Sequence, residues 1–295
     1  MKPADRIQIS DLIAKYTLEP LIRDVYVEGD RDQSFFNWLI PKMGLPSDVS
    51  VLPIRAIDVP RHLVQSHAFT RTGEHEELIT LALELNRSLA SYPPHVTCVA
   101  DAEFDHLLSR PRQATGLVYT DGSSLEAYAY RAEVVTKFLS LLAPFPFDAN
   151  HVLQQIGPVL QERFLIRAAN EQLGWEMSWL EKLGTAKVNK DSGTLEFDSA
   201  AFIHAYLQKN ARFSEEQRFR KCLETLRTRV THPTWASLCG HDYAAILAHF
   251  IRPFLPPGLR DFRSGAFCER SLMMCLEAAD ISREPMFAAL RARLA

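Results

Sequence analysis

This chain of 295 residues lacks a long uncharged apolar run, a paired cysteine motif and a strong net charge. Spanning a bilayer takes roughly 18–20 apolar residues in a row, and none occurs, so we predict no membrane span. The first residues lead into a mixed amphipathic stretch, which predicts no secretory signal and a cytoplasmic location. The chain has 33 Lys and Arg against 36 Asp and Glu, so its overall charge gives no attraction for nucleic acid. Binding of nucleic acid would therefore rely on local basic patches and metal ions.

The cysteines exclude two further classes of protein. There are five of them, an odd number, and no two form a C-x-x-C pair. This spacing argues against a zinc ribbon and against a disulfide framework. We expect most of them to be small buried hydrophobic side chains. They are Cys98, Cys222, Cys239, Cys268 and Cys275.

The composition is that of a soluble globular protein with a sizeable core. Apolar residues make up 47% of the chain and charged residues 23%, which excludes disorder as the dominant state. In the first half, strand-like and helix-like segments alternate. The expected strands are residues 24–28, 49–59 (with Pro53 at an edge or bulge), 96–100 and 116–120, and the expected helices are 32–39, 74–90 and about 124–142. This alternation predicts an α/β fold with a mostly parallel sheet and flanking helices.

The second half of the chain changes character. A linker punctuated by Pro144 and Pro146 precedes a long helical stretch over residues 152–183. The turn Asp191-Ser192-Gly193 predicts a small hairpin within residues 187–198, and helices follow it. We therefore predict two domains, residues 1–148 and a mainly helical domain of residues 149–295.

Acidic residues follow three of the predicted strands. Glu28 ends the first, Asp101, Glu103 and Asp105 alternate after the third, and Asp121 and Glu126 follow the fourth. Functional groups of open α/β sheets gather at the carboxyl ends of the strands. Converging carboxylates would repel by about 4 kcal/mol per close pair at an effective dielectric near 20. Unless several are protonated, a divalent cation must neutralise them, and oxygen ligands favour Mg²⁺ or Mn²⁺.

These segments carry a family resemblance that touches both halves of the chain. Residues 25–32, with Glu28-Gly29 and Asp32, resemble the E-G-x-x-D motif of Toprim domains, and residues 99–105 resemble the Toprim D-x-D-x-D motif, with Glu103 in place of the middle Asp. Residues 120–128 and 239–243 resemble segments of a Toprim-like family of uncharacterised-domain proteins found beside ABC-type ATPases. The resemblance extends to the nuclease effectors of PARIS-type anti-phage systems.

The resemblance implies a set of roles. Glu28 would act as acid/base or metal ligand, Asp101 would be the primary ligand for Mg²⁺, and Asp105 the next. Glu103, Asp32 and Glu126 would be further metal ligands. These ligands suit the cleavage of a phosphodiester. One or two metals held by them can bind the nonbridging oxygens and assist the nucleophile and the leaving group.

Each of these residues also has a simpler structural interpretation. Asp32 could cap a helix, Asp101 could cap a helix over residues 104–108, and Asp105 could be a solvated helical acid. Asp121 is more typical of a turn. His241 with Asp242 could be a catalytic pair. The simpler interpretation is that His241 lies at a helix N-terminus and Asp242 caps that helix.

Basic residues offer two candidate contacts for nucleic acid. One is the segment around the second predicted strand, with Arg55, Arg61 and Arg71, where signals for a helix are poor. A loop of that length in an α/β domain is often functional. The other is the charged helix with Arg218 and Lys221, although a mixed helix of this kind is usually a solvated face.

The resemblance thus implies a Mg²⁺-dependent endonuclease, a toxic effector that cleaves transfer RNA under the control of an ABC-type ATPase and could dimerise when active. No P-loop (G-x-x-x-x-G-K-[ST]) occurs, so ATP hydrolysis would come from the partner. The alternatives are a DNA-nicking Toprim nuclease and a non-catalytic Toprim-like module that binds an ATPase. A primase- or topoisomerase-like subunit ranks last, because the chain lacks the extra domains of those machines.

Overall fold

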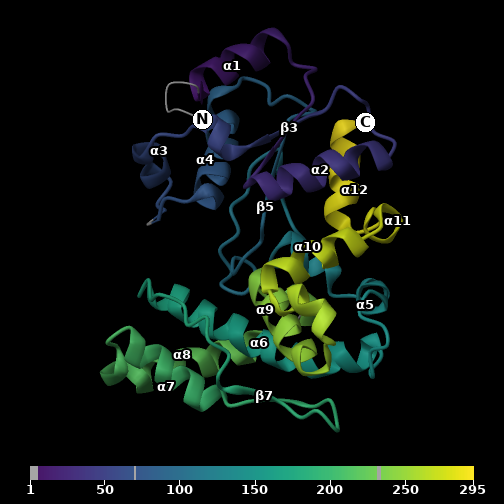
Figure 1. Cartoon of the computed structure of the whole chain (residues 1–295). Helices are drawn as coiled ribbons and strands as arrows, with labels where there is room; N and C mark the ends of the chain where they lie inside the picture. Colours follow the sequence, from purple (N-terminus) through teal and green to yellow (C-terminus); the bar gives the residue numbers. More distant parts are fainter. Residues whose placement is uncertain (1–5, 70, 231–233) are drawn as a thin grey trace. The chain divides into compact units, whose positions relative to one another are not determined.

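A computed structural model describes residues 6–69, 71–230 and 234–295 (Figure 1). The predicted α/β class, with a parallel sheet in the N-terminal region and a small hairpin among many helices, is confirmed. Two compact units make up the chain. One comprises the described residues up to Ala102 together with Pro111–Asp121 and Glu277–Ala295, and the other comprises Glu103–Arg110 and Gly122–Leu276. The division predicted at residue 148 therefore falls inside the second of these units.

The first unit is built on a parallel four-stranded sheet in the order β3-β2-β5-β6. Its strands are β3 (Ser50–Pro53), β2 (Asp24–Val27), β5 (Thr97–Ala100) and β6 (Leu117–Tyr119). All four residues of β2 and of β5 are buried, as expected for inner strands covered on both faces. Pro53 ends β3, which is an edge strand. An edge strand tolerates proline, which lacks a backbone N–H, because no further strand pairs with it on its outer side. A short parallel pair, β1 (Ile7–Gln8) with β4 (Ile57–Asp58), belongs to the same unit.

Helices cover both faces of this sheet (Figure 1). The helices of this unit are α1 (Ile9–Leu18), α2 (Asp30–Lys42), α3 (Arg61–Ser66), α4 (Glu74–Ser88), α11 (Ala278–Ile281) and α12 (Pro285–Leu294). On one face, α1 and α4 bury a core with Tyr26 and Cys98 from the strands. On the other, Phe35 and Phe36 of α2 contact Phe287 of α12, with ring centroids 6.2 and 6.3 Å apart. The C-terminal helix is thus part of the α/β unit.

The second unit is mainly helical. Its elements are η3 (Leu125–Ala129), α5 (Ala132–Ser140), α6 (Ala149–Leu173), β7 (Ala186–Val188), β8 (Leu195–Phe197), α7 (Ser199–Lys209), α8 (Glu216–Arg229), α9 (Gly240–Ile251) and α10 (Gly265–Cys275), with short 3₁₀ turns between them. Asp148 caps α6 by accepting the N–H of His151 at 2.8 Å. The antiparallel hairpin β7–β8 confirms the predicted one.

Three local predictions were wrong. The helix expected over residues 124–142 is split into η3 and α5, because Arg131 is extended (φ −139°, ψ 145°). The helix expected to run to residue 183 ends at Leu173, because Gly174 takes the left-handed conformation (φ +64°). The segment judged poor in helix signals contains α3, which begins at Arg61 after Pro60. Among the described residues, no helix combines the length and the apolarity that a membrane crossing requires.

Candidate functional site

Two of the predicted carboxylates lie at neighbouring strand ends of the first unit. Glu28 directly follows β2 and Asp101 directly follows β5, and these strands pair in parallel with Val27 opposite Val99. The backbone N–H of Asp101 donates to Glu28 Oε1 at 2.8 Å. This hydrogen bond joins the carboxyl ends of the two strands, the edge at which open α/β sheets gather functional groups.

A histidine that sequence reasoning missed completes this arrangement. His75 is the second residue of α4 and is 9% exposed. Its Nδ1 lies 2.8 Å from Glu28 Oε1, the same oxygen that accepts the Asp101 N–H. The pattern of carboxylates after strands does not indicate His75, because this residue lies in a helix that precedes a strand. Its one local signal is its position just after Gly73 at the start of an acidic helix.

The segment after Glu28 forms a helix cap. The N–H of Gly29 donates to Asp32 Oδ2 at 2.9 Å, so the capping interpretation of Asp32 is confirmed. A side chain at Gly29 would have Asp32 Oδ2 and Glu74 Oε2 as its nearest neighbours, both 3.8 Å from its Cβ. A second acid, Glu74, therefore reaches the same turn from the start of α4.

The start of α4 is a region of negative charge. Glu74, Glu76 and Glu77 all lie in its first turn. Burial raises the pKa of Glu77; Arg6 opposes this rise, while the charges of the neighbouring acids, Asp58 included, add to it. A cation would relieve this repulsion.

The other predicted metal ligands belong to the second unit. Glu103 is exposed, with a left-handed backbone (φ +39°), and its N–H donates to the Ser123 carbonyl at 2.8 Å. Asp105 is buried and accepts a hydrogen bond from Arg110 Nε at 3.1 Å, so its interpretation as a solvated helical acid is wrong. Glu126 lies in η3, with its carboxylate against Gly240.

Two further acids have structural partners. Asp121 accepts the backbone N–H of Met286 in the first turn of α12, through Oδ1 at 3.1 Å and Oδ2 at 3.2 Å. Asp242 is 2% exposed and pairs with Arg163 Nη2 at 2.6 Å and Arg167 Nε at 2.8 Å. The capping role considered for Asp242 is wrong, because α9 has no side-chain cap.

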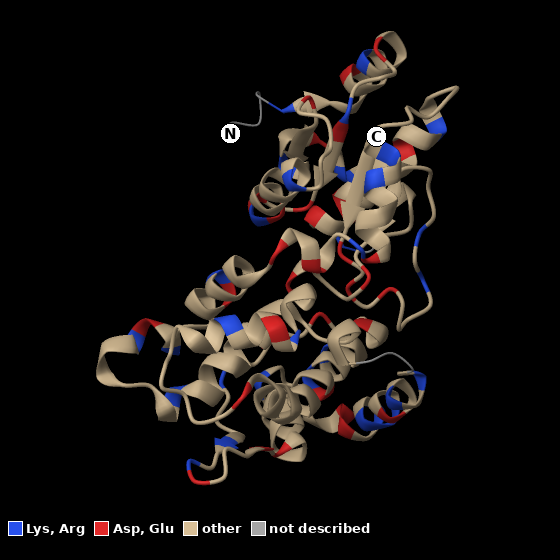
Figure 2. Ribbon diagram, turned by 90° about the vertical axis from the view of Figure 1, so that its right-hand side faces the viewer, with Lys and Arg blue, Asp and Glu red and all other residues tan. Residues whose placement is uncertain are grey.

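The predicted basic contacts are distributed over both units. In the first, Arg55 is exposed and pairs with Asp30, Arg61 is exposed at the start of α3, and Arg71 is half-buried. In the second, Arg218 of α8 is exposed and lies 3.8 Å from Glu215. Figure 2 shows Lys and Arg interspersed with Asp and Glu along the helices of both units.

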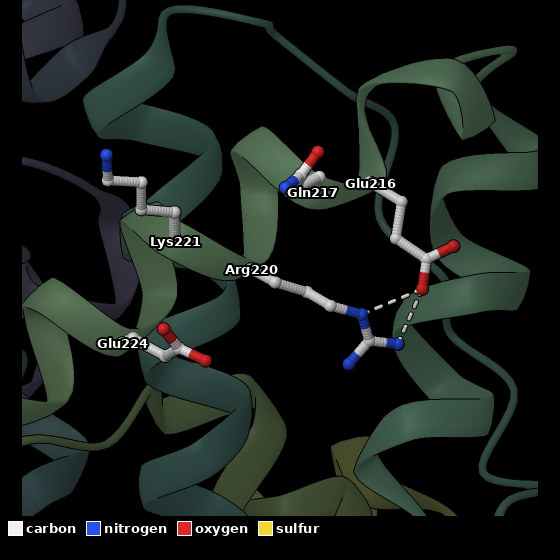
Figure 3. Close-up of a pocket in the computed structure, with 5 residues that line it drawn as sticks. All are labelled: Glu216, Gln217, Arg220, Lys221 and Glu224. Carbon is white, nitrogen blue, oxygen red and sulfur yellow. Dashed lines mark hydrogen bonds and ion pairs between the residues drawn. The ribbon is translucent and has the colours of Figure 1, made fainter.

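A surface hollow on α8 has the same mixed character. It is lined by Glu216, Gln217, Arg220, Lys221 and Glu224. Arg220 points toward Glu216 and pairs with it at 2.6 Å, whereas Lys221 extends to the other side (Figure 3). Because the two glutamates balance the two basic residues, the hollow has no net attraction for phosphate, and α8 fits a solvated charged face.

No protein-family model matches the chain, and no curated protein matches its sequence. The donor set of the first unit fits Mg²⁺ or Mn²⁺, since Glu28 and Asp101 bring hard carboxylate oxygens to adjacent strand ends beside an acidic helix start.

Proposed function

We propose that this chain is a Mg²⁺- or Mn²⁺-dependent Toprim-like nuclease that hydrolyses nucleic-acid phosphodiesters, with transfer RNA as the favoured substrate. The observation that carries the proposal is the hydrogen bond from the Asp101 N–H to Glu28 Oε1. It brings together the residues that match the two acidic Toprim motifs. The resemblance to effectors of anti-phage defence suggests an ABC-type ATPase as the controlling partner.

In this proposal Glu28 and Asp101 of the first unit hold the metal, with Asp32 of the same unit as a further candidate. Bound there, the metal would polarise the phosphoryl group and lower the pKa of its water. Glu28 moves a proton to or from the attacking or leaving oxygen through its carboxylate. Asp32 has a second task, because its Oδ2 also caps α2 through the Gly29 N–H.

A cleavage assay tests the nuclease. Wild type and Glu28→Ala are incubated with Mg²⁺ or Mn²⁺ and with bulk transfer RNA, single-stranded RNA or plasmid DNA, with EDTA as a metal-free arm. Loss of a general acid or base reduces the rate by about 10²–10⁴-fold. Asp48→Ala is the matched control, because this acid of the same unit is exposed and pairs with Arg23 at 3.2 Å.

The outcomes separate the candidate functions. Metal-dependent cutting that is lost in a folded Glu28→Ala protein but kept in Asp48→Ala supports the nuclease and identifies its substrate. Cutting that survives Glu28→Ala contradicts the assigned site. A protein that stays inert with its ATPase present, yet binds that ATPase, fits the alternative of a Toprim-like binding module, which Glu103 in place of the middle Asp of the motif favours.

A further inference from the structure

We propose that His75 is a positioning residue that fixes the orientation of the Glu28 carboxylate; the functional consequence rests on the nuclease proposed above. His75 lies outside both Toprim-like motifs. It reaches Glu28 from α4, an element that packs on β5. The contact is side chain to side chain, between His75 Nδ1 and Glu28 Oε1 at 2.8 Å.

Two contacts of Glu28 converge on one oxygen. Oε1 receives the Asp101 N–H at 2.8 Å and faces His75 Nδ1 at 2.8 Å. In the proposed role His75 carries a hydrogen on Nδ1 and donates it to Oε1. Two donors from two different elements prevent the carboxylate from rotating. Oε2 is thereby the oxygen presented to a cation or to a transferred proton.

Burial makes this contact specific. The side chains of His75 and Glu28 are 10% and 15% exposed, respectively, so water competes little for the hydrogen bond. Outer residues of this kind orient a metal ligand, and their loss typically weakens metal binding by about 10–100-fold. The role requires a donor at the position of Nδ1, which the side-chain amide of Asn can supply and the methyl group of Ala cannot.

Mn²⁺ affinity tests the proposal without relying on cleavage. Calorimetric titrations compare wild type, His75→Ala, His75→Asn and His67→Ala. The last variant is the matched control, because His67 also contacts a buried glutamate, Glu84, at 2.7 Å in the same unit. We expect His75→Ala to bind Mn²⁺ about 10–100-fold more weakly, and His75→Asn and His67→Ala to stay close to wild type.

Either of two results would overturn the positioning role: wild-type affinity in His75→Ala, or equal losses in His75→Ala and His75→Asn. If His75→Ala fails to fold, ¹⁵N NMR of the wild-type histidines tests the proposal instead, by showing which ring nitrogen of His75 carries a hydrogen. A hydrogen on His75 Nδ1 supports the proposal, and a bare Nδ1 contradicts it.

The same data distinguish this inference from the proposed function. If wild type cleaves nucleic acid and His75→Ala binds Mn²⁺ normally, the positioning role fails and the nuclease stands. If Mn²⁺ binding depends on His75 but nothing is cleaved even with the ATPase present, the nuclease fails and the positioning role stands. Absence of Mn²⁺ binding by wild type overturns the metal-ligand role on which both rely.

Discussion

A buried cluster of three charges in the second unit illustrates how single residues hold this protein together. Arg163 and Asp242 are 1% and 2% exposed, and Arg167 shares the same carboxylate. The Arg163 guanidinium also lies over the rings of Trp179 and Phe202, at 4.7 and 5.0 Å from their centroids. A cation so enclosed depends on its counterion, since neither water nor salt can replace it.

Removing that counterion should destabilise the second unit strongly. We expect Asp242→Asn to lower the free energy of unfolding by about 3–5 kcal/mol at pH 7, because Arg163 is left buried without a full counter-charge. Urea denaturation measures the loss. Glu215→Gln is the control, since its pair with Arg218 is partly exposed and is worth at most about 1 kcal/mol. Equal losses in the two variants would contradict the argument.

The advantage of wild type over Asp242→Asn should also depend on pH. Burial by itself would raise the pKa of Asp242, but hydrogen bonds and charges from Arg167 and Arg163 outweigh it and hold this pKa below its usual value. A depressed pKa stabilises the folded state above the unfolded-state pKa, and that stability is lost as the pH falls through the folded-state pKa. The difference between the two proteins should therefore shrink below about pH 4, and denaturation at pH 7 and pH 3 checks it. A difference that grows on acidification would contradict the ion pair.

The cysteines should divide by reactivity. Burial raises the pKa of Cys98 and of Cys268 to about 12 each, so neither forms much thiolate at pH 8. We expect iodoacetamide to label the half-buried Cys222 and Cys275 first, with all five labelled only after unfolding, as read by peptide mass spectrometry. Native-state labelling of Cys98 as fast as that of Cys222 would be inconsistent with this packing.

At the scale of elements, two glycines take the left-handed conformation for different purposes. Gly174 (φ +64°) ends α6 in open space, whereas Gly193 (φ +65°) turns the β7–β8 hairpin against the ring of Phe147. Ala at either position incurs about 1–2 kcal/mol of backbone strain. We expect Gly193→Ala to be the more destabilising in urea denaturation, because its Cβ would also meet Phe147. Equal effects would show that the Phe147 ring moves aside.

At the scale of the whole molecule, segments from early and late in the sequence pack together in one unit. Phe287 of α12 packs on Phe35 and Phe36, and Arg23 Nε donates to the carbonyl of Leu294 at 3.0 Å. The first 148 residues lack this helix. An α/β unit cut there would leave one face of its sheet partly uncovered.

We therefore expect Phe287→Ala to destabilise the first unit by about 3–5 kcal/mol, the usual loss for a buried aromatic side chain. Proteolysis of the full-length variant, followed by mass spectrometry, should detect early cleavage within residues 24–102. The exposed Phe267, truncated to Ala, is the control. A fragment of residues 1–148 is digested in a separate experiment. If this fragment resists the protease as well as the intact chain does, the role of α12 is contradicted.

Local pattern predicted much of the fold. Val25 to Val27 and Thr97 to Ala100 are short apolar runs that became inner strands, and Asp191-Ser192-Gly193 marked the hairpin. One prediction failed for a local reason. Arg131 breaks a helix that its neighbours would continue, and its Nε donates to the Tyr128 carbonyl at 3.0 Å.

The candidate site was also predicted only in part. The sequence by itself determined that Glu28 and Asp101 follow strands of a parallel sheet, because alternating strands and helices imply such a sheet, and its carboxyl ends share one edge. That the two strands are neighbours is given by the structure. Only the tertiary structure decided that His75 joins them and that α12 returns to the sheet. Both depend on packing between segments 47 residues or more apart, which no local periodicity encodes.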